Sequence, residues 1–206
     1  SALAAGAALG DQAAGVVLLN AAGPFSDEQA PPKGWGAITR QTIAGALLKS
    51  PVLQRLLFEN LRRPATIRRT LNQVYVDKTN VDEALVEAIR RPSLDPGAFG
   101  VFRTVFDIPR GQPLDELFAQ LTCPLLLLWG IRDPWINAVG RRAAFQRHAP
   151  AGTREVVLEA GHCPHDEVPD QVNAALLDWI AGLSSGAAPL QADGRATVAA
   201  SGQTAA

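Results

Sequence analysis

The sequence predicts an α/β fold built on a parallel sheet. Three short apolar runs predict strands at residues 16–19, 123–130 and 155–158. The first two are nearly continuous in apolar residues, which is typical of strands buried on both faces of a parallel sheet. Segments with apolar residues at three- and four-residue intervals separate the runs, and this alternation of strand and helix favours the α/β class.

The first part of the chain passes from a helix to a strand and then to several helices. Residues 1–9 are rich in alanine and predict a short helix that stops at Gly10, before the strand at 16–19. The strand breaks at residues 20–24, a loop position that commonly borders a ligand crevice in such sheets. A loop at 26–35 follows, and helical periods then cover residues 42–48, 51–61, 65–76, 81–91 and 95–106.

The second part returns to the sheet. A short helix begins at 113–117 and precedes the strand at 123–130; a helix at 138–148 then leads to the strand at 155–158. The last helix, at 169–183, places Val172, Leu176, Trp179 and Ile180 on one face.

These elements predict three regions. Residues 1–30 and 112–183 form the core, and residues 31–111 form a helical cap inserted between two strands. Residues 184–206 are mostly small or polar, and we expect this tail to be disordered.

The composition narrows the class of function. The chain has 206 residues, of which 47% are hydrophobic and 19% charged, which suits one well-buried core. A net charge of −1 gives no electrostatic footprint for nucleic acid, and no apolar run reaches the ~18 residues of a membrane span. Cys123 and Cys163 are too few for a disulfide framework or a metal site, so we expect free thiols, no metal and no cofactor. With nucleic acid and a membrane span excluded, we expect the partner to be a small molecule.

Two loops each offer one ionisable group. Asp133 follows the strand that ends near residue 130, and His162 follows the strand at 155–158. Taken alone, an Asp before a Pro commonly forms a turn, and a loop His is commonly a surface group. The loops after parallel strands emerge at one edge of the sheet, however, so the two side chains can meet. A carboxylate bonded to an imidazole fixes its tautomer and stabilises the imidazolium, so the placement predicts a pair for proton transfer.

Other polar and aromatic features are better explained without a function. The arginine pairs 62–63, 68–69 and 90–91 could form an anion-binding rim, but solvated helix faces are the more common outcome. Trp35, Phe58 and Tyr75 could line a pocket, although core packing is the more common fate of aromatic residues.

The two loops also carry a resemblance. Residues 124–135, Pro-Leu-Leu-Leu-Leu-Trp-Gly-Ile-Arg-Asp-Pro-Trp, and 160–169, Ala-Gly-His-Cys-Pro-His-Asp-Glu-Val-Pro, resemble the last two catalytic segments of the α/β-hydrolase fold superfamily. Together with residues 17–25 and the cap segment 71–77, they are similar to its pheophytinase-like clade of plants, algae and cyanobacteria. The resemblance spans about residues 2–183 and implies a partial α/β-hydrolase fold with an inserted cap.

The resemblance implies a role for each motif residue. Asp133 becomes the triad acid and His162 the general base, while His165 and Glu167 shape the loop around the base. His165 as the base is the weaker alternative, because the family places the base directly after the glycine, here Gly161.

One part of the family pattern is not found. A nucleophile elbow, Gly-x-Ser-x-Gly between a strand and a helix, should precede the helix at 2–9, and Ser1 does not fit it. We therefore expect the chain to be the C-terminal part of a serine hydrolase acting on a small-molecule ester. On this reading the chain lacks the N-terminal half of its fold, is inactive alone, and exposes an unpaired strand edge.

Two alternatives stay open. An Asp nucleophile would give an epoxide hydrolase or dehalogenase of the same fold, and a module without catalysis would bind a ligand or a protein. By resemblance alone, we expect a chloroplast or cytoplasmic location.

Overall fold

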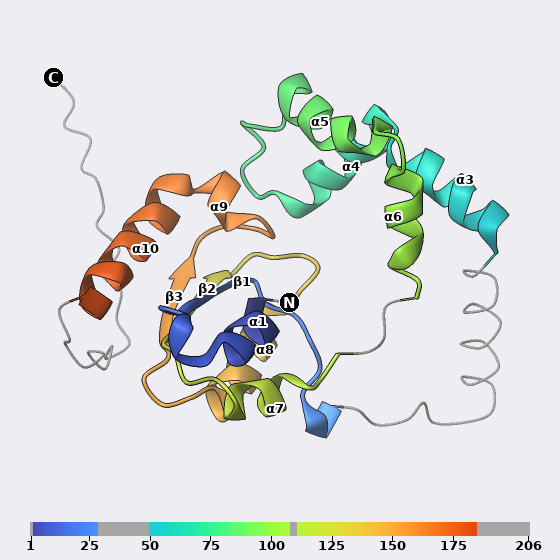
Figure 1. The fold of residues 1–206 in the computed structure, drawn as a ribbon. Coiled ribbons are helices and arrows are strands. Elements are labelled where there is room, and N and C mark those ends of the chain that lie inside the picture. The colour runs from blue at the N-terminus through green and yellow to red at the C-terminus, as the bar shows by residue number, and fades with distance from the viewer. Residues whose placement is uncertain (1, 29–49, 108–110, 185–206) are drawn as a thin grey trace, which may run out of the picture.

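The computed structural model describes residues 2–28, 50–107 and 111–184 (Figure 1). The helix expected at 42–48, Trp35 and nearly all of the tail expected at 184–206 lie outside these residues. The structure contains a parallel sheet in the order β1 (Val16–Leu19), β2 (Leu125–Gly130) and β3 (Arg154–Leu158). The expected α/β class is confirmed.

The central strand β2 is buried along its whole length and separates two apolar layers. Because side chains alternate across a strand, Leu125, Leu127 and Trp129 face one layer, and Leu126 and Leu128 face the other. The first layer contains residues of α1 (Ala2–Leu9), α7 (Leu114–Ala119) and α8 (Ala138–His148). The second layer is closed by α10 (Pro169–Ser184), which lies on the opposite side of the sheet (Figure 1).

The face of α10 differs from the expected one at a single residue. Val172, Leu176 and Trp179 pack on the sheet as expected, but Ile180 is 51% exposed. The spacing of the first three residues continues to Leu183, which also packs on this layer. Ile180 follows Trp179 directly, so it is rotated about 100° away from the buried stripe.

Several helices between β1 and α7 gather beside the sheet (Figure 1). They are α3 (Pro51–Leu61), α4 (Pro64–Val74), α5 (Glu83–Arg90), η3 (Arg91–Leu94) and α6 (Ala98–Thr104). Their apolar residues form two groups, one between α3 and α6 around Phe58, and one between α4 and α5 that includes Ile67, Leu71 and Val86. Phe58 and Tyr75 are therefore core residues of this region.

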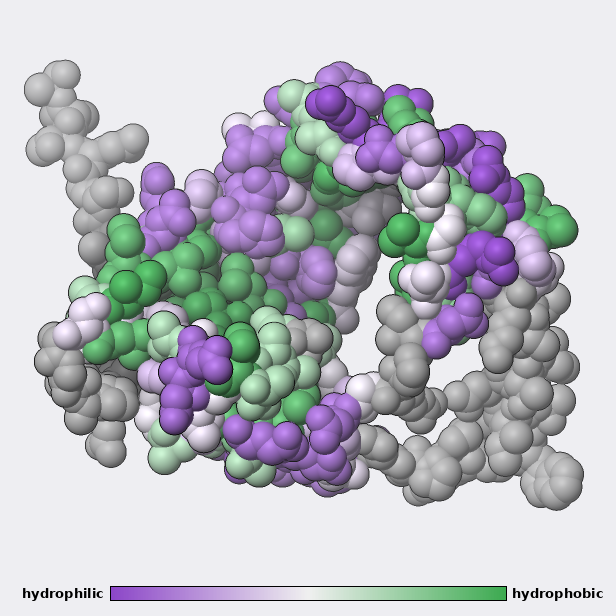
Figure 2. Space-filling view, in the orientation of Figure 1, coloured by the Kyte–Doolittle hydropathy of each residue, from purple (hydrophilic) through white to green (hydrophobic). Residues whose placement is uncertain are grey.

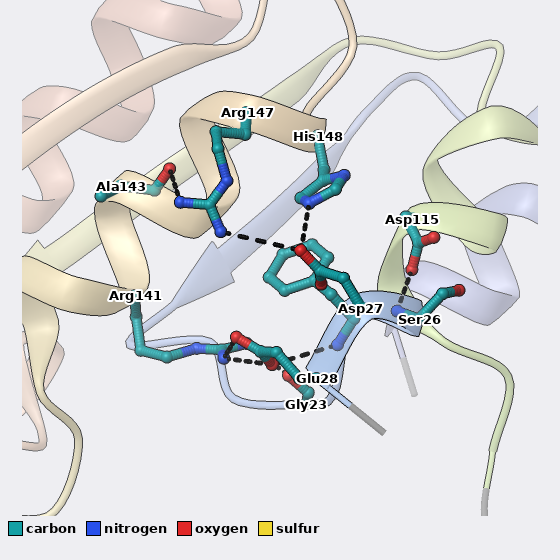
Figure 3. Close-up of polar contacts among 10 residues, drawn as sticks. Gly23, Ser26, Asp27, Glu28, Asp115, Arg141, Ala143, Arg147 and His148 are labelled. Atoms are coloured by element: carbon teal, nitrogen blue, oxygen red, sulfur yellow. Dashed lines mark hydrogen bonds and ion pairs between the residues drawn. The ribbon is translucent and has the colours of Figure 1, made fainter. Parts of the chain in front are cut away.

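A charged cluster anchors the chain where it leaves the core after β1, at η2 (Ser26–Glu28) (Figure 3). Arg141 of α8 binds Glu28 at 2.8 Å and donates to the carbonyl of Gly23. The hydrogen bond from Arg141 holds the pKa of Glu28 below its usual value. Ser26 N donates to Asp115 at the start of α7, at 2.9 Å. The segment after β1 is therefore fixed to α7 and α8.

Both edges of the sheet lack a strand partner within the described residues, since β1 and β3 each pair only with β2 there. Figure 2 shows apolar residues gathered over the strands between α10 and α1. Val17, Leu18 and Leu19 of β1 are only partly buried. Part of the apolar surface of β1 is therefore uncovered in the described residues.

Candidate active site

The turn at the end of β2 (residues 130–136, called the acid turn) buries Asp133. Its side chain is fully buried, and its Oδ1 accepts hydrogen bonds from Trp135 N at 2.8 Å and Ile136 N at 3.0 Å. These bonds are the turn-forming role that an Asp before Pro134 can take. They leave Oδ2 directed elsewhere, toward the loop after β3.

His162 meets that free oxygen. His162 Nδ1 lies 2.7 Å from Asp133 Oδ2, while 29% of the imidazole side chain stays exposed. The indole ring of Trp135 lies beside the imidazole, with 5.0 Å between the ring centroids. A carboxylate at Nδ1 fixes the tautomer in which Nε2 is free to accept a proton. The structure thus brings together the two residues that the sequence singled out first.

The acid turn lies close to the loop after β3 (residues 159–163, called the base loop) because Gly130 has no side chain. A Cβ on Gly130 would lie 2.0 Å from the Gly161 carbonyl oxygen, so a larger residue does not fit there. This approach lets Arg132 N donate to the Ala160 carbonyl at 3.0 Å. The two segments are therefore joined through their backbones as well as through the Asp–His pair.

Glu167 joins the base loop to the segment after α4. Its buried carboxylate accepts from Gly161 N at 2.9 Å, from Val76 N at 2.7 Å and from Asp77 N at 3.2 Å. His162 N also donates to the carbonyl of Val74, the last residue of α4, at 2.9 Å. The position of the base is thus tied to the end of α4 and to the residues that follow it.

A second set of contacts surrounds Cys163. The hydroxyl of Tyr75 donates to Asp166, and burial together with this bond raises the pKa of Tyr75 so that the phenol keeps its proton. Burial also raises the pKa of the Cys163 thiol, next to the base. Both cysteines are free thiols, as expected.

His165 is not brought to the pair. It is exposed on the short helix α9 (Pro164–Glu167), and its ring makes no hydrogen bond to any residue that the structure describes. Among the residues that it describes, the structure shows no contact through which His165 would shape the loop.

Three arginines of the expected solvated helix faces form ion pairs with nearby carboxylates, namely Arg62 with Glu59, Arg68 with Glu83 and Arg90 with Glu87.

The sequence analysis missed Asn20, which directly follows β1. Its side chain is buried and bonds to both the acid turn and the base loop. A signal was present, because an amide at the end of a buried strand lies at the same edge as Asp133 and His162. The strand break at 20–24 predicts only that these residues border a ligand crevice.

One stretch matches the letters of the serine motif. Gly182, Leu183, Ser184, Ser185 and Gly186 spell Gly-x-Ser-x-Gly, but Ser184 is the last residue of α10, and its Oγ donates to the Ile180 carbonyl. At about 1.5 Å per residue, it lies about 22 Å along the helix from Pro169. Residues 182–184 end a helix and do not follow a strand, so Ser184 is not placed as in a nucleophile elbow.

Within residues 2–28, 50–107 and 111–184, no group of three or more His, Cys, Asp or Glu side chains is arranged to hold a metal ion. None of the helices described there is long and apolar enough to cross a membrane.

The chain belongs to the alpha/beta hydrolase family, whose model matches residues 1–175. It is 30% identical over 180 residues to the chloroplastic pheophytinase of Arabidopsis thaliana, over 84% of this chain and 37% of that protein. The chain therefore spans little more than a third of this curated relative.

Solved structures share the fold. A putative lipase from Acinetobacter baumannii superposes with a TM-score of 0.62 at 16% identity, over 90% of this chain and 58% of that one. An enol-lactonase from Burkholderia xenovorans gives a TM-score of 0.56 at 19% identity, over 87% of this chain and 61% of that one.

Proposed function

We propose that this chain supplies the acid and the base of a serine hydrolase that cleaves carboxylic esters, with Asp133 as the acid and His162 as the base. The observation that carries the proposal is the 2.7 Å contact between His162 Nδ1 and a fully buried carboxylate oxygen of Asp133. The other carboxylate oxygen is held by two backbone N–H groups, so the carboxylate cannot rotate away from the imidazole without losing them.

The pair performs two proton transfers. Nε2 accepts the hydroxyl proton of the nucleophile as its oxygen attacks the ester carbonyl carbon, and Asp133 stabilises the imidazolium. The imidazolium then returns the proton to the leaving alcohol oxygen as the ester C–O bond breaks. Water repeats the cycle on the acyl group and releases the acid.

The nucleophile and the oxyanion hole belong to a segment outside these 206 residues in this proposal. Ser184 ends a helix, and within the described residues no strand precedes α1. The term full-length protein is used below for the polypeptide that contains these residues and that segment. The 206 residues alone are proposed to be inactive.

The substrate class follows from the relative at 30% identity. Its name gives pheophytin as the substrate of that protein and the chloroplast as its location. We take pheophytin as the first natural ester to test here, and the chloroplast as the first location to examine.

Steady-state hydrolysis of a p-nitrophenyl ester by the full-length protein tests the proposal. His162→Ala and Asp133→Asn each lower kcat by on the order of 10⁴-fold, because either change removes the oriented base. The matched control is His165→Ala, which removes an exposed imidazole from the same loop and keeps kcat within about two-fold. Equal activity of His162→Ala and the unmodified protein would overturn the proposal, as would a full-length protein that hydrolyses no ester and only binds.

A further inference from the structure

We infer that Asn20 is a positioning residue for the Asp133–His162 pair, holding the acid turn and the base loop at the separation that the pair requires. The inference rests on the proposed function, because it assigns Asn20 a part in placing the base. Asn20 itself does not touch the reacting atoms.

The contacts of Asn20 reach both segments. Its Oδ1 accepts from Gly130 N at 2.7 Å, at the start of the acid turn. Its Nδ2 donates to the Gly161 carbonyl at 2.8 Å and to the carbonyl of His162 at 3.1 Å. A carboxamide is the one common side chain that presents an acceptor and two donors in one plane, and here each side serves a different segment.

The backbone of Asn20 adds a second requirement. Its φ is 40°, in the left-handed region that Asn tolerates better than most residues with a side chain. Its N–H donates to the Leu128 carbonyl at 2.9 Å, which fixes the residue at the end of the sheet. The amide is therefore aimed by a rigid element.

These bonds close a ring of contacts around the pair. Asp133 N donates to the Gly130 carbonyl at 3.2 Å, Gly130 N donates to Asn20, and Asn20 donates to the His162 carbonyl. The ring closes through the Nδ1–Oδ2 contact. Removing the amide frees the two segments to separate, and a misplacement of about 1 Å in a catalytic group can cost on the order of 10²-fold in rate.

Two substitutions separate the amide from the backbone. Asn20→Gly keeps the left-handed backbone and removes all three side-chain bonds. Asn20→Asp keeps the acceptor for Gly130 N but sets a carboxylate oxygen against the carbonyls of Gly161 and His162. The matched control is Asn80→Gly, at an exposed turn residue whose side chain makes no hydrogen bond to the residues described.

The experiment measures kcat and KM for p-nitrophenyl ester hydrolysis by the full-length protein, and the low-field proton resonance of His162 Nδ1–H. Both Asn20 variants lower kcat by on the order of 10²-fold with KM within about two-fold, and both shift or broaden the resonance. Asn80→Gly changes neither quantity.

Folded variants with unchanged kcat and an unchanged resonance would overturn the inference. Loss of folding in both variants would also overturn it, since Asn20 would then serve the fold rather than the pair. If the unmodified protein hydrolyses no ester, the proposed function fails. The resonance of His162 needs no substrate, so it still tests whether Asn20 positions the Asp133–His162 pair.

Discussion

The bonds that Glu167 makes to the base loop and to the segment after α4 can be tested through Glu167→Gln. Each oxygen of this buried carboxylate has its own task, since Oε1 accepts from Gly161 N and Oε2 accepts from Val76 N and Asp77 N. A glutamine keeps one acceptor oxygen. If that oxygen keeps the bonds to Val76 and Asp77, the new NH₂ group faces the Gly161 N–H donor.

The magnitude follows from these three bonds. An orphaned buried donor costs about 1–3 kcal/mol, and each remaining bond loses about 1 kcal/mol when its acceptor loses its charge. The neutral amide is cheaper to bury than a carboxylate, which offsets part of the loss. The net effect is a free energy of unfolding lowered by about 2–3 kcal/mol.

Urea unfolding followed by tryptophan fluorescence measures the change. With an m value of about 2 kcal/mol/M, the midpoint falls by about 1–1.5 M. The control is Glu159→Gln, in the same loop, where an exposed ion pair with Arg132 limits the change to about 0.5 kcal/mol. A shift for Glu167→Gln no larger than that of the control would refute the reasoning.

Three further predictions concern other parts of the chain. Gly130→Ala places a Cβ 2.0 Å from a carbonyl oxygen and lowers the free energy of unfolding by at least about 2 kcal/mol. The control Gly100→Ala, in open space on a helix, raises the free energy of unfolding by about 0.5–1 kcal/mol. The midpoints of urea unfolding measure both changes. Burial raises the pKa of Cys163, so this thiol holds less thiolate at pH 7.5 in the folded protein than in the unfolded one. Iodoacetamide should therefore modify Cys163 more slowly in the native protein than in urea. Equal rates of modification in the native and the urea-unfolded protein would contradict this. The folded-state pKa of Glu28 is lowered by Arg141, so its contribution is present above about pH 4.5 and is lost as pH falls through the folded value. Glu28→Gln should therefore lose less stability than the unmodified protein between pH 6 and pH 3, by under about 1 kcal/mol at this partly exposed site, and an equal loss in both would contradict the assignment.

The sheet and the pair were predictable because each depends on a local pattern. The apolar run at 125–129 has few outcomes other than a buried strand, and the parallel sheet then places Asp133 and His162 at one edge. Ile180 shows the limit of this approach, since a one-residue error in a helical stripe rotates the side chain toward solvent.

The contacts that hold the pair were not predictable from the sequence. Asn20 lies 142 positions from His162 along the chain, and its three bonds depend on the exact approach of Gly130 and Gly161. Glu167 was predicted by resemblance alone, and its bonds to Val76 and Asp77 follow from how α4 ends against the base loop. Such contacts arise from tertiary packing, which no local pattern encodes.

The central claim is that His162 acts as the base for a nucleophile outside these residues. A fluorophosphonate probe reacts with the activated serine of such an enzyme, and mass spectrometry of the labelled full-length protein locates the adduct. We predict one adduct, on a serine outside residues 1–206, that is lost in His162→Ala and kept in Ser184→Ala. An adduct on Ser184, or one that is kept in His162→Ala, would contradict the account.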